Sequence, residues 1–140
     1  MKMKKDTLEC VRVFHETYGL PVKDAPHLDD ARVNSLRISL LQEELDELKE
    51  ALEQGDEVGV LDALTDLQYV LDGAYLSLGF HDLKNAAFAE VQRSNMSKLG
   101  RDGKPVVRPE DGKILKGPDY TPPDLTMVME TWRASRKKAA

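Results

Sequence analysis

The sequence predicts an all-α protein: a bundle of four to five helices with a small C-terminal hairpin or loop region. Three observations lead to this class. Apolar residues recur at spacings of three and four through residues 6–98, Asp and Gly stand where helices would begin and end, and residues 100–123 are rich in Gly and Pro. With 140 residues, 41% of them hydrophobic and 32% charged, the chain fits one domain spanning 1–140.

The first two helices are predicted from their caps and apolar spacing. Asp6 is the expected cap of a helix that runs to about Tyr18 and ends before Gly19 and Pro21. Its expected inward residues are Leu8, Val11, Phe14 and Cys10. A second helix should span about 30–53, with an inward stripe made of Ile38, Leu41, Leu45, Leu48 and Leu52.

The third and fourth helices complete a helical core over about 6–98. Residues 58–79 are apolar around most of the helix circumference, which predicts the buried centre of the bundle. Asp82 is the expected cap of a fourth helix that runs to about Lys98. Short loops between the helices favour antiparallel neighbours.

The remaining chain predicts a hairpin and a last helix. Two short apolar pieces, 105–107 and 113–115, flank a Pro-Glu-Asp-Gly turn and should form a small hairpin over the bundle. A final helix at about 124–137 would have Asp124 as its cap and one apolar side made of Leu125, Val128, Met129 and Trp132.

Charge and cysteine content narrow the classes of function. The net charge is -5 and the 20 basic residues are dispersed, which argues against binding of a nucleic-acid polymer. Cys10 is the single cysteine, and neither a signal peptide nor an apolar run of membrane-spanning length is seen. We therefore expect a soluble, cytoplasmic protein without a membrane partner. The bundle is thin for a lone domain, so a homodimer is expected.

An acidic stripe on the second helix is the first candidate site. At 100° per residue, Glu47 lies about 40° and Glu44 about 100° from Glu43 around the helix axis. A solvated charged face would look similar. However, the stripe continues an apolar face formed by Val33, Leu36 and Leu40, which favours partial burial of the acids.

A second pair of acids lies on the third helix. Asp62 and Asp66 are one turn apart among leucines, where they need either Lys or Arg partners or a cation. In an antiparallel pair of helices turning at 54–56, Glu47 and Asp62 are about equally far from the turn. The resulting group of carboxylates would suit Mg²⁺ or Mn²⁺.

Positive and amide side chains downstream could contact the phosphates of a substrate held by such a metal. The fourth helix ends with Arg93, Asn95 and Lys98, and Lys116 follows in the loop region. A lysine in a loop is usually only solvated. Asn95 and Lys98, one helical turn apart, are the strongest pair.

These motifs together carry a resemblance. The order Glu43-Glu44-x-x-Glu47, then an acidic helix with Asp66, then Ser94-Asn95-x-x-Lys98 resembles the MazG-type all-α nucleoside triphosphate pyrophosphohydrolases. The stretches FAEVQRSNMSK and DGKILKGPDYTPPDL are similar to those of bacterial MazG-like dUTPases. The resemblance covers about residues 8–125.

The resemblance implies a substrate, a cofactor and roles for residues. The substrate would be a (deoxy)nucleoside triphosphate, with dUTP a candidate, cleaved to the monophosphate and pyrophosphate. Mg²⁺ would be held by Glu43, Glu44, Glu47 and Asp66, and Asn95 and Lys98 would contact phosphates. One departure concerns Ala63, where the family has Glu; Asp62 is the expected substitute.

The expected mechanism is attack of a metal-activated water on the α-phosphorus, with Glu44 or Glu47 as the general base. The resemblance also places the base and sugar pocket against the first helix, where Phe14, His15 and Tyr18 are candidates and Tyr69 is a further one. An equally strong alternative makes Phe14 a core residue and His15 a surface residue.

Two other functions stay open on the sequence alone. A phosphoribosyl-ATP pyrophosphohydrolase-like enzyme would use the same acids on a different substrate. A catalytically impaired, nucleotide-binding helical dimer would follow from loss of the glutamate at position 63.

Overall fold

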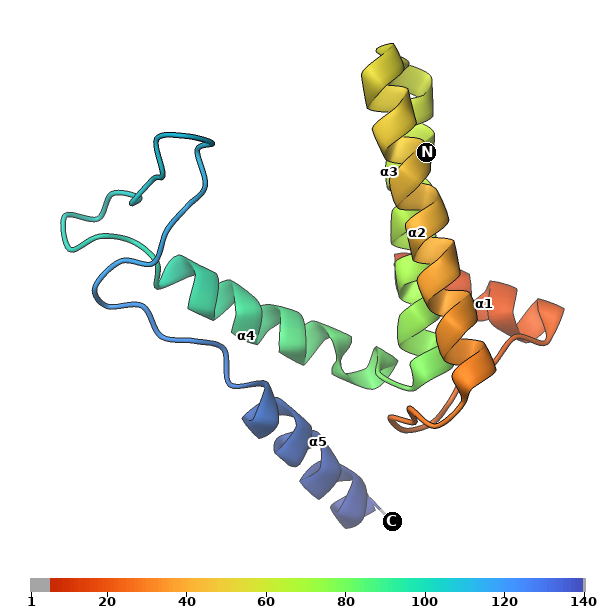
Figure 1. The fold of residues 1–140 in the computed structure, drawn as a ribbon. Coiled ribbons are helices and arrows are strands. Elements are labelled where there is room, and N and C mark those ends of the chain that lie inside the picture. The colour runs from red at the N-terminus through yellow and green to blue at the C-terminus, as the bar shows by residue number, and fades with distance from the viewer. Residues whose placement is uncertain (1–5, 140) are drawn as a thin grey trace. The chain divides into compact units, whose positions relative to one another are not determined.

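The computed structural model describes residues 6–139, and this range contains helices but no strands. The chain divides into two compact units, residues 1–82 and residues 83–140 (Figure 1). The all-α class predicted from the sequence is confirmed. No described helix is both long and apolar enough to cross a membrane.

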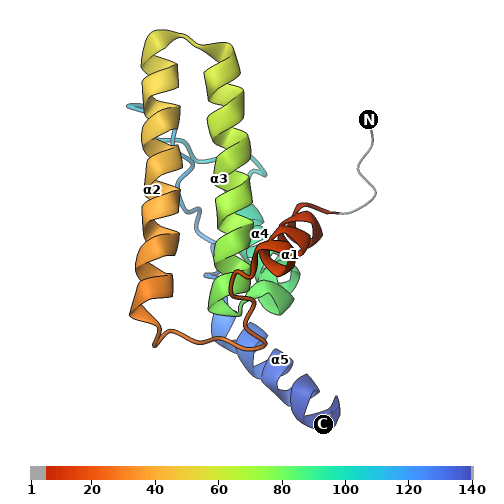
Figure 2. The same ribbon diagram turned by 90° about the vertical axis from the view of Figure 1, so that its right-hand side faces the viewer.

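Three helices make up the first unit, and each has an acidic cap, of which Asp6 was predicted. They are α1 (Thr7–Tyr18), α2 (Ala31–Gln54) and α3 (Glu57–Leu78). The side chain of Asp6 accepts a hydrogen bond from the Glu9 amide at 2.8 Å, and those of Asp30 and Asp56 act in the same way. α2 and α3 form a long antiparallel hairpin, and α1 packs against α3 (Figure 2).

The loop between α1 and α2 is tied to the C-terminal end of α3. The amides of Lys23 and His27 each donate to an α3 carbonyl at 3.0 Å. Gly79 ends α3 with a φ of 80°, and a Cβ there would collide with the carbonyl of Ala25. This end of the hairpin is therefore well enclosed.

The core of the first unit differs from the predicted one. On α2, Ile38, Leu45 and Leu52 were expected to face inward, but each is exposed by more than half. The inner stripe instead runs through Val33, Arg37, Leu40, Glu44 and Ala51. The reason is geometric: within this unit, α2 packs chiefly on α3, and one helix can cover only one side of it.

Two further expectations about burial are corrected. α3 is buried over its C-terminal half, from Asp72 to Ser77, whereas Val58, Leu61 and Leu64 near the turn are exposed. On α1, Val11 is buried as predicted, but His15 is also buried, at 2% exposure, and Phe14 is 37% exposed. The carbonyl of Pro21 is a hydrogen-bond partner of the His15 imidazole, and this bond offsets the free-energy cost of burying the ring.

The second unit contains α4 (Lys84–Met96) and α5 (Leu125–Ala139). A short 3-10 turn, His81–Leu83, precedes α4, so Leu83 occupies the N-cap position and the predicted Asp82 cap is wrong. The predicted cap of α5 is confirmed, because the Asp124 side chain accepts from the Met127 amide at 2.9 Å.

The predicted hairpin is confirmed as a short antiparallel bridge between Val107 and Ile114. The amide of Arg108 donates to the Lys113 carbonyl, and that of Leu115 to the Val106 carbonyl, both at 2.8 Å. The chain then returns to the end of α4, where the Gly117 amide donates to the Lys98 carbonyl at 2.9 Å. A Cβ at Gly117 would strike that carbonyl, so the close return requires glycine.

Candidate functional site

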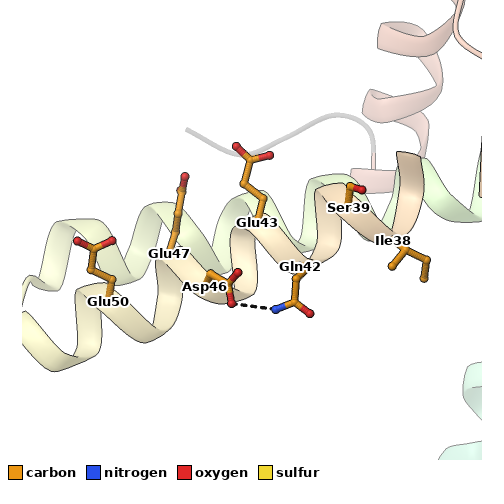
Figure 3. Close-up of a pocket in the computed structure, with 7 residues that line it drawn as sticks. All are labelled: Ile38, Ser39, Gln42, Glu43, Asp46, Glu47 and Glu50. Carbon is orange, nitrogen blue, oxygen red and sulfur yellow. Dashed lines mark hydrogen bonds between the residues drawn. The ribbon is translucent and has the colours of Figure 1, made fainter. Parts of the chain in front are cut away.

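The acids of α2 divide into two sets according to their direction. Glu43 and Glu47 point to the same side of the helix, whereas Asp46 turns toward Gln42, whose amide donates to it at 2.8 Å (Figure 3). Together with Glu50, these acids line an open depression along α2, whose residues are Ile38, Ser39, Gln42, Glu43, Asp46, Glu47 and Glu50. Because one helix supplies every lining residue, the depression is accessible to solvent.

Glu44 lies behind this depression, on the side of α2 that faces α3. Glu44 is half-buried, and its Oε2 atom is buried without a hydrogen-bond partner among the described residues. Burial raises the pKa of the Glu44 carboxyl, and the nearby carboxylates of Glu47, Asp66 and Glu43 raise it further. Glu44 of α2 and Asp66 of α3 are thus close enough to repel one another.

These acids are not arranged as a finished metal site. Within residues 6–139, no three His, Cys, Asp or Glu side chains form a group that could hold a metal ion. The donor set still suits a hard divalent cation, because it offers carboxylate oxygens only and one of them is buried and unpaired. A cation between α2 and α3 would offset the repulsion that raises the pKa of Glu44.

The position of Ala63 bears on the departure from the family pattern. Ala63 is 1% exposed, and Asp66, three residues later on the same side of α3, is half-buried. Asp62 is exposed and lies about 100° further around the helix than Ala63. Asp62 is also not among the groups that shift the pKa of Glu44. Its predicted role as a metal ligand stays a prediction.

In the second unit, Arg93 is held in a network within its own unit. Its guanidinium donates to both carboxylate oxygens of Glu90, at 2.9 and 2.8 Å, and to the Thr121 hydroxyl at 2.6 Å. Glu90 also accepts from the Asp124 amide, and the hydrogen bond from Arg93 is the main cause that lowers the pKa of Glu90 to about 2. Arg93 would have to leave these partners to bind a phosphate.

The other predicted phosphate contacts lie close together along the same unit. Asn95 is exposed and Lys98 half-buried at the end of α4, and the return at Gly117 brings the backbone beside Lys116 to that of Lys98. The Lys116 ammonium lies 4.9 Å from the centre of the Tyr120 ring. Two lysines 18 positions apart in the sequence are therefore neighbours at one end of α4.

The residues predicted for the base pocket lie around a cavity of about 230 Å³ between the three helices of the first unit. Phe14, His15 and Tyr69, predicted as base-pocket residues, all line it, together with Arg37 and the apolar residues Val11, Leu20, Leu40 and Val70. Phe14 and Tyr69 meet edge to face at 5.6 Å, and Tyr18 lies against Phe14 at 4.5 Å.

Arg37 was missed by the sequence analysis. The signal was its angle on the second helix: position 37 lies about 120° from Glu43, next to the directions of Glu44, at about 100°, and Val33, at about 80°. The side of the second helix that carries Val33 and Leu40 was expected to be partly covered, and Arg37 lies on that side.

Comparison with known proteins places the chain in a family. No match is found among curated proteins. Among solved structures, the chain is similar to a protein from Exiguobacterium sp. 255-15 described as a candidate NTP pyrophosphohydrolase, with 26% identity, coverage of 97% of this chain and 99% of that one, and a TM-score of 0.47. The sequence model of the phosphoribosyl-ATP pyrophosphohydrolase family matches residues 11–95, which is more than half of the chain.

The match covers α1 from residue 11 onward, all of α2 and α3 and nearly all of α4, so it includes both acidic helices and Asn95. It confirms the superfamily to which the motifs pointed and favours an enzyme over a non-catalytic helical dimer. The chain belongs to the phosphoribosyl-ATP pyrophosphohydrolase family and is a hydrolase that acts on phosphoric anhydrides.

Proposed function

We propose that the protein hydrolyses a (deoxy)nucleoside triphosphate, with dUTP as the first candidate, to the nucleoside monophosphate and pyrophosphate. Its role would be to remove unwanted nucleotides from the pool. The observation that carries the proposal is the buried, unpaired Oε2 of Glu44 among the carboxylates of Glu43, Glu47 and Asp66. Such a group is costly in an empty protein and useful in one that binds a cation with a polyphosphate.

We propose Mg²⁺ as the cofactor, with Mn²⁺ as an alternative. Glu43, Glu44, Glu47 and Asp66 would hold it, and Asp62 is the nearest further carboxylate along α3. When bound, the metal neutralises phosphate charge and lowers the pKa of water. The family match and the all-oxygen donor set support this cofactor.

The chain's own residues would divide the remaining work. Glu47 is exposed in the open depression, where it can meet water, and Glu44 lies behind it, close enough for the Glu47 charge to raise the pKa of Glu44. Because the pKa of Glu44 is raised, this pair can accept a proton more readily than an isolated glutamate. Asn95 and Lys98 would donate hydrogen bonds to phosphate oxygens and offset their charge.

Phosphoribosyl-ATP is the second candidate substrate. The specific finding in its favour is the name of the matching family. The same acids would serve, since the bond that is cleaved is again between the α- and β-phosphates, and only the group beyond the α-phosphate differs.

We further propose that the protein acts as a homodimer. The outer sides of α2 and α3 carry six apolar residues that are each 51–79% exposed: Ile38, Leu45, Leu52, Val58, Leu61 and Leu64. So many exposed apolar side chains on two neighbouring helices are uncommon on a monomer, and a two-fold axis would let the same side of the hairpin cover itself.

A substrate panel tests the proposed activity. Purified protein is incubated with each common ribo- and deoxynucleoside triphosphate, dUTP and phosphoribosyl-ATP, in Mg²⁺ and in Mn²⁺, with pyrophosphate and orthophosphate measured separately. The proposal predicts pyrophosphate and a monophosphate from dUTP or a small set of substrates. Exclusive turnover of phosphoribosyl-ATP would select the second candidate, and release of orthophosphate would contradict the site of cleavage.

Matched variants connect the activity to the acids. Glu47→Gln should lower kcat by about 10²- to 10⁴-fold, as expected for loss of a general base or metal-binding carboxylate. Glu53→Gln removes the same charge from the same helix, at an exposed position whose oxygen is 3.9 Å from Lys49. It should stay within about twofold of the wild type, since exposed pairs contribute little. Equal effects of the two variants would refute the assignment.

A further inference from the structure

The cavity in the first unit is lined by a buried cation, Arg37. Arg37 is 6% exposed, and its guanidinium has no hydrogen bond or ion pair with any residue in the range 6–139. Burial lowers the pKa of Arg37, which shows that the protein does not solvate this charge well. A guanidinium offers donors only, so the missing partner must present acceptor atoms.

His15 provides the opposite hydrogen-bonding character in the same place. Its Nδ1 lies 3.0 Å from the Pro21 carbonyl oxygen, and because that oxygen can only accept, Nδ1 carries the hydrogen. Burial and the Arg37 charge lower the pKa of His15 and keep the ring neutral. Nε2 is therefore an acceptor without a hydrogen.

Gly73 shows that the two groups are close together. A Cβ at this position of α3 would lie 3.1 Å from His15 Nε2 and closer still to Arg37 Nη1. The donor and the acceptor thus flank the same point beside α3. Both residues also line the cavity, whose other walls are apolar or aromatic.

The size of the cavity limits what can occupy it. Its volume of about 230 Å³ is below the range of about 300–1,000 Å³ typical of sites that enclose a whole drug-sized ligand. A single ring fits such a space, with the rest of the ligand outside it. Phe14 and Tyr69 supply aromatic surface against which a flat ring can pack.

We propose that Arg37 and His15 recognise the lactam edge of a pyrimidine base, with Arg37 donating to a ring carbonyl and His15 Nε2 accepting from the adjacent N–H. Uracil and thymine present this edge. Cytosine presents an amino donor beside an unprotonated ring nitrogen, which would set donor against donor and acceptor against acceptor. The proposal rests on the proposed nucleotide hydrolysis and deepens it, by making Arg37 a specificity-determining residue.

Binding of nucleosides tests this recognition without hydrolysis. Thermal unfolding of the wild-type protein is followed with uridine, thymidine, cytidine, inosine and N3-methyluridine, each at the same millimolar concentration. Uridine and thymidine should raise the Tm, whereas cytidine and N3-methyluridine, in which the N–H is absent, should not. Equal shifts with uridine and N3-methyluridine would overturn the proposal, as would a shift with inosine that exceeds that with uridine.

Kinetics with variants supply the second test. Arg37→Met should lower kcat/KM for dUTP by about 10- to 100-fold, the usual effect of losing a charged hydrogen bond, and leave kcat/KM for dCTP within about threefold. Arg32→Met, which removes an exposed arginine from the same helix, should change neither value. Equal losses for dUTP and dCTP would assign Arg37 a structural role only and overturn the proposal.

The two tests separate the two proposals. If the wild type hydrolyses none of the triphosphates but uridine still raises its Tm and N3-methyluridine does not, the base recognition stands and the proposed hydrolysis fails. If dUTP is hydrolysed no faster than dCTP, the hydrolysis stands and the base recognition fails. Where Arg37→Met does not fold, Arg37→Lys keeps the charge and loses the paired donors, and a reduced dUTP to dCTP ratio is again expected.

Discussion

The two sides of α2 carry the opposite kinds of side chain from those expected in a small helical domain. Its outer side carries Ile38, Leu45 and Leu52, which are exposed, whereas its inner side carries Arg37 and Glu44, which are buried or half-buried. Apolar groups normally leave water and charged groups stay in it. Each side therefore lacks something: the outer side an apolar partner, and the inner side the counter-charges of a ligand.

The difference shows how a binding site is stabilised by elements that do not themselves bind. Ala51 and Ala63 are the buried apolar residues nearest the α2–α3 turn, and their small size lets the two helices approach closely. The leucines that would have filled a wider gap point outward. Close approach brings carboxylates of both helices together and leaves the outward leucines exposed, which is the surface of the proposed dimer.

The largest effect is expected where the outer side is broken. Leu61→Glu combined with Leu64→Glu puts two charges on an apolar surface that is already 67% and 51% exposed, so a single chain should still fold. In a dimer the same charges would be buried without partners, at a cost of several kcal/mol. We expect the mass in solution, measured by sedimentation or light scattering, to fall from two chains to one.

A charge change away from this surface serves as the control. Thr17→Glu together with Glu16→Gln on α1 adds no net charge at exposed positions and should leave the mass unchanged. A wild-type protein that is already monomeric would contradict the dimer.

Much of the fold followed from local signals in the sequence. Asp6 and Asp124 cap the helices that they were predicted to cap, because a carboxylate can accept a hydrogen bond from a free amide three residues later in the chain. The exception, Asp82, fails because a 3-10 turn intervenes before α4. A cap can be recognised from sequence, but an extra turn between the cap and the helix cannot.

The direction of α2 could not be obtained in the same way. Its leucine stripe gave the strongest periodic signal, and periodicity shows that one side is apolar without showing which neighbour covers it. The two helices that carry the acids do pack on one another, whereas the expected pairing of Glu47 with Asp62 stays a prediction. The buried roles of His15 and Arg37 depend on how α1 crosses α3, which no spacing within one helix reports.

A medium effect is expected on the inner side from Gly73→Ala. The added Cβ would meet Arg37 and His15 in a packed interior, and overpacking of this kind usually costs about 1–3 kcal/mol. The urea midpoint should fall with an unchanged m-value. Pairing the change with Arg37→Met frees the space that the Cβ needs, so the double variant should recover part of the loss. Strictly additive effects would show that Gly73 and Arg37 are not coupled.

The smallest effect concerns Glu44 and depends on pH. Its pKa is raised above the ordinary value of 4.5, so its contribution to the stability of the metal-free fold is fully present below that pH and is lost as the pH rises through the raised value. Glu44→Gln cannot ionise and should not show this loss. At neutral pH without metal, the variant should therefore have the higher Tm. The difference in free energy of unfolding should be less than about 1 kcal/mol, because solvent screens much of the repulsion.

Mg²⁺ should reverse this order. The wild-type carboxylate gains a counter-charge when the cation binds, which raises the Tm, whereas the amide of Glu44→Gln offers a weaker ligand and should gain less. Glu53→Gln, exposed on the same helix, should follow the wild type under both conditions. If Mg²⁺ raised the Tm of wild type and Glu44→Gln equally, Glu44 would not be a ligand, and its buried oxygen would be a cost that the fold carries for another reason.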